Sequence, residues 1–367
     1  MLIHRKKKAF LSYYNCVVIL AFLFMLSKTL LFSENENLSR IIDIMQWPFL
    51  LYIASTLVET KIKRAVAIRF LLAMAIIIMF FISYINSGLA SLFKFSIIIL
   101  AAKKLRDYEL FRTIRNMYII ATVVIVLLGA LRIIPSLVVR RGYFTYGFVH
   151  SNVLAMFVFS AVCCDVMLLN KLSAKKLTLY IIVIIAIAML TDCRSVEVGI
   201  AAMIIISVIF SRSTNSFKEK RVFRGMLCSL PILCTLISIY LAHNYNRQNR
   251  FVMLIDNLSS TRVFLASRLV HALQLTAFGQ DCGDYLMENA YLTVLYAWGV
   301  IPGIITIVFY SFAIYKSFFE KHYGITACLI GFAVQGLFEG STLELFLNLA
   351  MLTPFMSVET DKQIRNN

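Results

Sequence analysis

Residues 61–88 read KIKRAVAIRFLLAMAIIIMFFISYINSG, in which four cations accompany the start of a long apolar run. About twenty helical residues are needed to cross the hydrocarbon core of a bilayer, so this run predicts a membrane-spanning helix at about 66–85. The cations stand at one end only, as lysine and arginine do where a span meets the cytoplasm. Both features recur along the chain, and together they decide the fold.

The composition of the whole chain agrees with this pattern. The 367 residues are 60% hydrophobic and only 15% charged, and the mean hydropathy is +0.82, which are values of a polytopic membrane protein. We therefore expect an all-α protein with about twelve transmembrane helices in a single domain, 1–367. The first apolar run is too long for a signal peptide, and we expect it to be retained as an anchor. The expected spans are 12–32, 41–58, 66–85, 88–102, 116–135, 149–169, 177–191, 196–211, 225–242, 288–314, 325–338 and 343–358.

The cations of the loops predict the orientation. Of the 36 lysines and arginines, 25 fall in alternate loops, and the positive-inside rule places those loops in the cytoplasm. Both termini are then inside, and the longest loop, residues 243–287, is outside. The net charge of +17 is mostly this topology signal, with attraction to anionic lipid heads, and does not indicate binding of nucleic acid.

The nine cations on the predicted outer side are all arginine, although the chain contains 17 lysines and 19 arginines. The positive-inside rule does not distinguish the two residues, whereas a guanidinium can bind phosphate or carboxylate through two parallel hydrogen bonds. We therefore expect the outer face to bind an oligoanion. Each arginine taken alone could instead extend to lipid phosphates. The nine are Arg40, Arg132, Arg140, Arg141, Arg194, Arg247, Arg250, Arg262 and Arg268.

The external loop contains four of these arginines and a segment with helical spacing. A serine at 259 or 260 could cap a helix that runs to about residue 278, with Gly279 as its terminator. Arg268 and His271, three residues apart, would share its polar side. We expect an amphipathic helix that lies on the outer membrane face and forms part of the functional site. Its apolar side would consist of Phe264, Leu265, Leu269 and Leu273.

Two further side chains are candidates for chemistry. His150 opens the sixth expected span, near clustered arginines, and an imidazole there suits a base or a hydrogen-bond donor to a ligand. A structural hydrogen bond within the fold is the alternative. Glu339 is a carboxylate at the rim of a span, which is costly and therefore indicates function. Pairing with an outer arginine would explain it equally well.

Several familiar motifs are missing from the sequence. No spacing of cysteine and histidine predicts a metal site. There is no Walker loop, no dinucleotide fingerprint and no Asp-x-Asp pair for a nucleotide-sugar. We therefore expect no metal and no cofactor, and chemistry on the outer face would need a donor that is already activated.

From about residue 115 to 350, a series of short motifs resembles the O-antigen polymerase/ligase superfamily, and specifically the polymerases of capsular and exopolysaccharide repeat units. Residues 147–152 are similar to the family pattern Gly-Phe-x-His-Pro-Asn, with Ser151 in place of proline. Arg268 and Gly279 enclose ten residues, as in the Arg-x10-Gly pattern of these polymerases. The other matches are Cys193-Arg194-Ser195, Phe278-Gly279, Glu288-Asn289-Ala290-Tyr291-Leu292, Gly299 and Gly336-Leu337-Phe338-Glu339.

The resemblance implies a glycosyltransferase of the bacterial plasma (inner) membrane that polymerises polysaccharide repeat units on the outer face. A glycan would pass from a polyprenyl-diphosphate carrier to another lipid-linked unit. The implied partners are this lipid-linked oligosaccharide, membrane lipids, a chain-length regulator and a flippase. The alternatives are a ligase of the same superfamily, a flippase that transports the lipid-linked oligosaccharide, and a purely structural membrane subunit.

On this interpretation the expected catalytic residues are Arg268, His150 and Glu339. Arg268 would stabilise the leaving diphosphate, and His150 or Glu339 would accept the proton of the attacking hydroxyl. The expected substrate-binding residues are Arg132, Arg140, Arg141, Arg194, Arg247, Arg250, Arg262, His271, Glu288, Asn289 and Tyr291.

Overall fold

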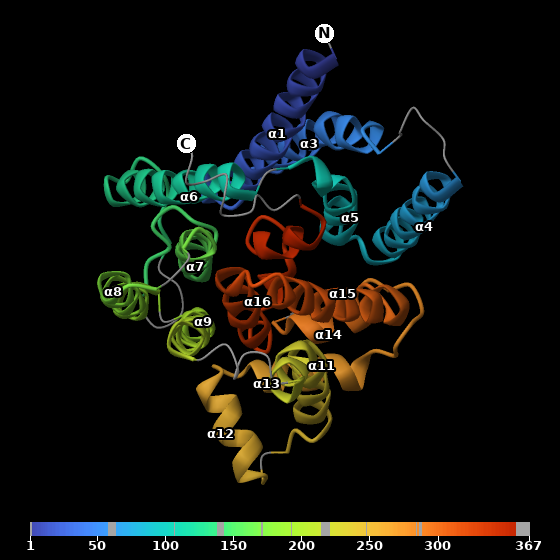
Figure 1. Ribbon diagram of the computed structural model, residues 1–367. Coiled ribbons are helices and arrows are strands. Elements are labelled where there is room, and N and C mark those ends of the chain that lie inside the picture. Colours follow the sequence, from blue (N-terminus) through green and yellow to red (C-terminus); the bar gives the residue numbers. More distant parts are fainter. Residues whose placement is uncertain are drawn as a thin grey trace. The chain divides into compact units, whose positions relative to one another are not determined.

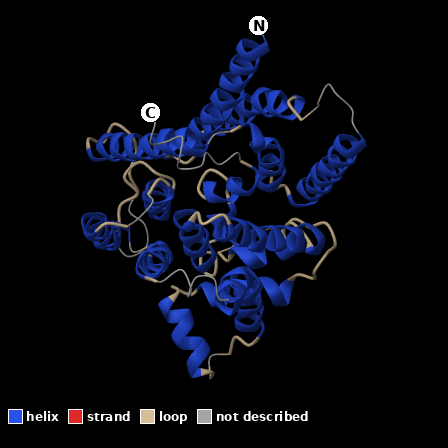
Figure 2. Ribbon diagram, in the orientation of Figure 1, coloured by secondary structure: helices blue, strands red, loops and turns tan. Residues whose placement is uncertain are grey.

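Helices joined by loops and turns make up the described part of the chain, which forms no sheet, as Figure 2 shows. An isolated antiparallel bridge joins Thr29 to Phe148. The expected all-α class is therefore confirmed. The computed structural model describes residues 2–57, 64–105, 107–137, 143–169, 172–191, 193–213, 221–246, 248–283, 285 and 288–356.

The chain divides into two compact units, and the longer helices of both are labelled in Figure 1. Unit 1 comprises Met1–Phe70, Ile97–Glu197 and Phe355–Asn367, and unit 2 comprises Leu71–Ser96 and Val198–Pro354. The chain passes from one unit to the other within α4 (Arg64–Ser87), α5 (Ser91–Ala101) and α9 (Arg194–Arg212), and again at the last residue of the 3-10 helix η4 (Leu349–Phe355).

Each unit also has helices of its own. Unit 1 contains α1 (Leu2–Ser27), α2 (Leu30–Ser33), α3 (Glu36–Ser55), the 3-10 helix η1 (Ala102–Lys104), α6 (Asp107–Ala130), α7 (Ser151–Met167) and α8 (Ala174–Thr191). Unit 2 contains α11 (Arg221–His243), α12 (Arg250–Leu258), α13 (Arg262–Ala272), α14 (Ala290–Tyr296), α15 (Val300–Phe319), α16 (Tyr323–Gln335), the 3-10 helix η3 (Gly340–Leu343) and all of η4 except its last residue.

Six helices in the described residues are long and apolar enough to cross a membrane, which agrees with a multi-pass membrane protein. Their apolar surface is largely uncovered by the fold: only 17% of the window Phe70–Ser87 is buried. Lipid is the solvent that such a surface requires. The six candidate spans are Phe70–Ser87, Glu109–Ala130, Ala174–Thr191, Arg194–Arg212, Arg221–His243 and Val300–Phe319.

The other expected spans differ from a simple crossing helix. Four are shorter apolar helices, Tyr13–Ser27, Ser91–Ala101, Ser151–Met167 and Tyr323–Gln335. The last of these is 13 residues long and measures about 20 Å, which is less than the thickness of the hydrocarbon core. The span expected at 41–58 corresponds to α3, whose polar first half keeps it outside the six candidates.

Two expected spans near the C-terminus are interrupted. The expected helix 288–314 is divided at Gly299 into α14 and α15. In place of a helix across 343–358, the described residues form η3 and η4. Glu344 and Asn348 are polar, and Pro354 lacks the amide hydrogen that a continuing α-helix needs.

Gly279 and Gly299 lie where two parts of unit 2 cross at close range. The amides of residues 300 and 301 donate to the carbonyls of residues 276 and 277, at 2.9 and 3.1 Å. Both glycines have positive φ angles, +85° and +99°. A Cβ on Gly279 would overlap the carbonyl oxygen of Ala297, and a Cβ on Gly299 would overlap the amide nitrogen of Gly279. Two glycines of the motif series are thus explained by packing.

The loop that is expected to be external forms two short helices, α12 and α13, and the prediction of a single helix from residue 259 or 260 to 278 is wrong. Ser260 and Thr261 adopt left-handed backbone conformations that separate the two helices. Thr261 is the N-cap of α13. That helix ends at Ala272, so Gly279 is not its terminator. Its buried side consists of Val263, Ala266, Ser267, Leu269 and Val270, so of the expected apolar side only Leu269 is fully buried.

Candidate functional site

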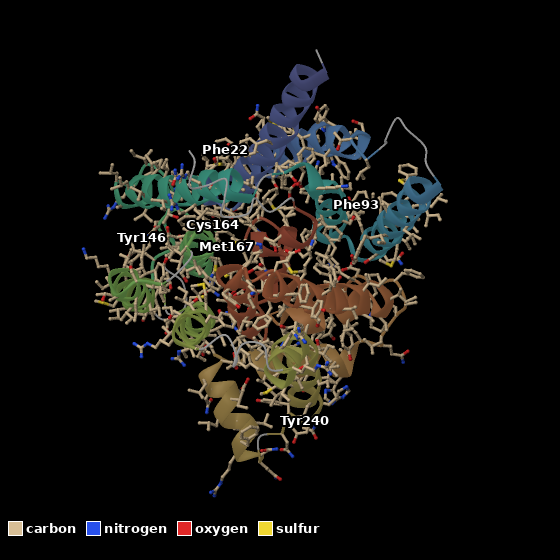
Figure 3. The ribbon with its side chains drawn as sticks, viewed as in Figure 1. Phe22, Phe93, Tyr146, Cys164, Met167 and Tyr240 are labelled. Atoms are coloured by element: carbon tan, nitrogen blue, oxygen red, sulfur yellow. The ribbon has the colours of Figure 1, made fainter. Side chains whose placement is uncertain are left out.

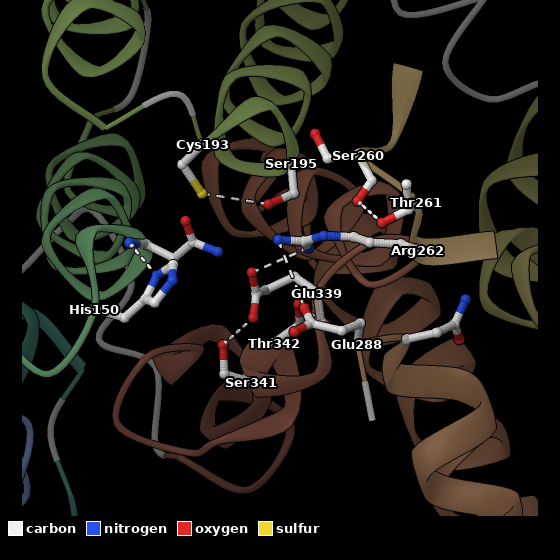
Figure 4. Close-up of polar contacts among 12 residues, drawn as sticks. His150, Cys193, Ser195, Ser260, Thr261, Arg262, Glu288, Glu339, Ser341 and Thr342 are labelled. Carbon is white, nitrogen blue, oxygen red and sulfur yellow. Dashed lines mark hydrogen bonds and ion pairs between the residues drawn. The ribbon is translucent and has the colours of Figure 1, made fainter. Parts of the chain in front are cut away.

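Arg262 lies between two carboxylates in unit 2, as Figure 4 shows. Its Nη1 donates to Glu339 Oε2 at 3.2 Å, and its Nη2 is 3.6 Å from Glu288 Oε2. Ser341 Oγ donates to the other oxygen of Glu339 at 2.9 Å. The side chains of Arg262 and Glu339 are 13% and 11% exposed, whereas that of Glu288 is 32% exposed. The cluster is shielded around Arg262 and Glu339 and opens toward solvent at Glu288.

A sharp turn places Arg262 at the start of α13. Ser260 and Thr261 have φ angles of 59° and 69°, which are uncommon for residues with a side chain and cost about 1 kcal/mol or more each. The side chain of buried Asp256 accepts a hydrogen bond from the Phe264 amide at 2.9 Å. It satisfies an amide of the first turn that the N-cap, Thr261, leaves without a side-chain partner. This hydrogen bond therefore joins a residue before the turn to a residue after it.

Asn289 fixes the backbone beside Glu288. Its Oδ1 accepts from the amides of residues 291 and 292, both at 3.0 Å, and so caps α14. Its Nδ2 donates to Ser238 Oγ at 2.9 Å and to the carbonyl of Leu337 at 2.7 Å. These bonds use the ordinary capacity of a carboxamide. Asn289 thus ties α14 to α11 and to the segment that carries Glu339. Its role in substrate binding stays a prediction.

Tyr291 was also predicted to bind substrate, and the structure buries it. The side chain is 2% exposed, and its hydroxyl donates to the carbonyl of Ala333 at 2.7 Å. This bond holds α14 against α16. The Tyr291 hydroxyl is therefore engaged within the fold, and its role in substrate binding stays a prediction.

Arg268 and His271 lie on the exposed side of α13, as the sequence predicts. The guanidinium carbon of Arg268 is 6.0 Å from the centroid of the Tyr285 ring, which is the range of a cation–π contact. His271 Nδ1 lies 2.8 Å from the carbonyl oxygen of Ser267, and its ring packs at 5.8 Å from that of His243. Arg268 thus presents a cation on the face of α13 opposite to its buried side.

His150 belongs to unit 1 and is the N-cap of α7. Its Nδ1 accepts a hydrogen bond from the Asn152 amide at 3.1 Å. A neutral imidazole whose Nδ1 accepts carries its proton on Nε2, so the exposed nitrogen of this ring is a donor. The Gly147–Val149 backbone is fixed to the end of α1 by two further bonds, Leu30 N to the Gly147 carbonyl at 2.9 Å and Val149 N to the Lys28 carbonyl at 3.1 Å. This geometry favours the structural alternative for His150, with a donor left over.

Three of the remaining predicted arginines lie in the described residues, and they are not members of the ion pairs that Arg262 forms with Glu288 and Glu339. Arg132, Arg194 and Arg250 are exposed, with Arg194 at the start of α9 and Arg250 at the start of α12. Arg140, Arg141 and Arg247 lie outside the described residues.

A second ionic cluster, in unit 1, was missed from the sequence. Asp165 on α7 accepts from Arg115 Nη1 at 2.8 Å, from Lys176 Nζ at 2.5 Å and from the Tyr180 hydroxyl at 2.7 Å. These partners come from α6 and α8, so one carboxylate joins three helices. The available signal was an acidic residue inside an apolar run, which is the feature that selected Glu339.

No known protein family, curated protein or solved structure matches the chain. The site is therefore characterised by its chemistry. The Glu339 carboxylate is held in one orientation by Arg262 and Ser341, and a positioned carboxylate can accept a proton from a hydroxyl. Within the described ranges, no three histidine, cysteine, aspartate or glutamate side chains are grouped as metal ligands would be.

Proposed function

We propose that the chain is a glycan polymerase of a bacterial plasma membrane, because its motifs resemble those of such polymerases. It would join repeat units that reach the outer face on a polyprenyl diphosphate. The oxygen of an acceptor hydroxyl forms a bond to C1 of the donor sugar. The bond from C1 to the diphosphate oxygen breaks, and the diphosphate leaves with the electron pair.

The observation that carries the proposal is the group formed by Arg262, Glu288 and Glu339. One guanidinium lies between two carboxylates, and the Glu339 carboxylate is oriented by Arg262 and Ser341. Such a group is suited to accept the proton of the attacking hydroxyl, and we assign this step to Glu339. Arg262 then acts as a positioning residue, because it contacts the carboxylates and holds their geometry.

Arg268 supplies the opposite charge in this proposal. It lies six residues after Arg262, on the exposed side of the same helix. A guanidinium can stabilise the negative charge that develops on a leaving diphosphate through two parallel hydrogen bonds. The proposal therefore divides the arginines of α13 into one that positions the base and one that meets the anion.

The test is a reconstituted reaction. Purified protein in lipid nanodiscs, supplied with lipid-linked repeat units and no nucleotide, should yield a ladder of oligomers on the carrier lipid. Glu339→Gln should insert and purify normally and yield no ladder. A wild-type protein that transfers glycan only to a different acceptor would be a ligase. One that only moves the units between the leaflets of a liposome would be a flippase, and either result would refute the proposal.

The proposed orientation, with residues 243–287 outside, has a test of its own. Gln248→Cys in the external loop should react with a membrane-impermeant maleimide on intact cells, and Lys175→Cys should react only after the cells are opened. Native Cys282 interferes little, because burial raises the pKa of its thiol to about 11 and keeps it in the less reactive protonated form. Labelling of Lys175→Cys but not of Gln248→Cys on intact cells would invert the orientation.

A further inference from the structure

Helix α12 has an uncovered apolar face outside the candidate spans. Phe251, Leu254 and Leu258 are 61%, 57% and 60% exposed. Their spacing of three and four residues places them on one side of the helix. Exposed Arg250 and Asn257 flank this side, and Val252 and Asp256 point to the opposite, buried side. The nine residues thus form an amphipathic helix with a polar edge.

The buried side fixes α12 to the end of a candidate span. Val252 is fully buried in a cluster with Leu241 and Val263. Leu241 lies in the last turn of α11, whose residues 221–243 are long and apolar enough to cross a membrane. Because side chains in such a cluster are in contact, α12 is held at the level where α11 leaves the bilayer. Figure 1 shows α12 projecting at the edge of unit 2 beside α13.

The apolar surface of α11 continues to the same level. Leu236 and Tyr240 on this helix are 58% and 56% exposed, and Tyr240 is labelled in Figure 3. Aromatic side chains of this type are common where a span reaches the interface. Lipid that covers the end of α11 is therefore next to α12. The cation of Arg250 at the polar edge suits the phosphate level of the membrane.

We propose that α12 lies in the membrane interface at the end of α11, with acyl chains in contact with Phe251, Leu254 and Leu258. An interfacial helix buries its apolar face to about 5–10 Å and keeps its charged edge at the headgroups. The membrane-binding element of the external loop is then α12, and α13, whose outer side carries Arg268 and His271, is left free to face solvent or a ligand. The inference needs only α11 to span a membrane and does not depend on the proposed reaction.

Spin labels on the apolar face and on the polar edge of α12 test this placement. Leu254→Cys and Asn257→Cys are each labelled with a nitroxide in a Cys228→Ser background and reconstituted in nanodiscs of phosphatidylethanolamine and phosphatidylglycerol. Oxygen concentrates in the bilayer, whereas a nickel chelate stays in water. The ratio of oxygen to nickel collision rates should be several-fold higher at 254 than at 257. Leu258→Cys should repeat the result for 254.

Two results would overturn the proposal. Equal ratios at 254 and 257, both typical of water, would place the apolar face outside the membrane. Low collision rates with both reagents at 254, together with dipolar broadening between labels, would show that a second copy of the chain covers the face. Both substitutions are on exposed positions, and elution as a single species in size-exclusion chromatography confirms that the labelled proteins are folded.

Discussion

Each of the two units contains a cluster of ion pairs, which is centred on a carboxylate in unit 1 and on a guanidinium in unit 2. In unit 1, the single carboxylate of Asp165 binds two cations, Arg115 and Lys176, at 2.8 and 2.5 Å. In unit 2, the single guanidinium of Arg262 is shared by two carboxylates, Glu339 at 3.2 Å and Glu288 at 3.6 Å. A hydroxyl completes each cluster, from a tyrosine in the first and a serine in the second.

The difference separates a structural cluster from a reactive one. Both oxygens of Asp165 accept from cations, and the three helices that it joins follow one another in the chain. Arg262 and Glu339 are 77 residues apart, and their cluster lies among short helices and turns. Two cations and a tyrosine hydroxyl donate to Asp165, which suits a carboxylate that joins helices. One guanidinium and one serine hydroxyl donate to Glu339, whose remaining lone pairs can accept from a further donor. We therefore expect mutations in the first cluster to change stability and mutations in the second to change rate.

Glu339→Gln should have the largest effect. It keeps the shape of the side chain, and its one oxygen can still accept from Arg262 while the Ser341 hydroxyl can turn to accept from the new amide NH2. The carboxylate that would accept the proton is removed. Loss of a general base typically lowers a rate by about 10²- to 10⁴-fold. Initial rates of ladder formation should fall by that factor, while the yield and the melting temperature in detergent change little. A variant with full activity would make the unit 2 cluster structural, like that of Asp165.

Arg268→Lys tests whether the exposed Arg268 guanidinium stabilises the leaving diphosphate, a role that we do not assign to Arg115 or Arg262. A lysine keeps the charge and loses the two parallel hydrogen bonds, so we expect a loss of about 2–4 kcal/mol of transition-state stabilisation, or roughly 30- to 1000-fold in rate. Arg115→Lys, in the unit 1 cluster, is the matched control and should leave the rate per folded molecule unchanged. Equal rates for wild type and Arg268→Ala would reduce Arg268 to an interfacial anchor.

The sequence predicted the helical class and the apolar runs because both depend on local composition. Of the twelve expected spans, six are helices long and apolar enough to cross a membrane in the described residues, and four are shorter apolar helices. Hydropathy does not distinguish a lipid-exposed helix from a buried one. Helix α16, which is almost wholly buried, is apolar because it is surrounded by protein. The sequence did not predict the left-handed backbone of Ser260 and Thr261, because serine and threonine give no local signal for that conformation.

The sequence predicted individual residues of the candidate site but not which of their side chains are in contact. The sequence identified Glu339 by its position at the rim of a span, but the Arg262 pairing joins residues far apart in the chain and leaves no local pattern. The sequence shows Asp165 as an acidic residue in an apolar run, but it does not show the pairing with Arg115, which is 50 residues away. Asn289 and Tyr291 stand in the motif series, and only the structure shows that their polar atoms are used within the fold.

Asp165→Ala should destabilise unit 1 with little effect on chemistry. Two cations in a partly buried site would lose their common partner, which we expect to cost about 2–4 kcal/mol of the free energy of unfolding. The melting temperature in detergent should fall, and the rate per folded molecule should stay the same. A rate loss without a change in melting temperature would contradict the structural assignment of this cluster.

Arg40→Ala should have the smallest effect and sets the baseline for the outer arginines. Its ion pair with Glu36 is 3.6 Å long, and the two side chains are 76% and 87% exposed. Water and salt screen such a pair, so its loss should change stability by less than about 0.5 kcal/mol. Polymerisation should also proceed at the wild-type rate. If Arg40→Ala instead slows the reaction as much as Arg268→Ala, the outer arginines attract the anionic substrate as a general field. The contrast between a guanidinium at a defined site and one that only adds to the surface charge would then be lost.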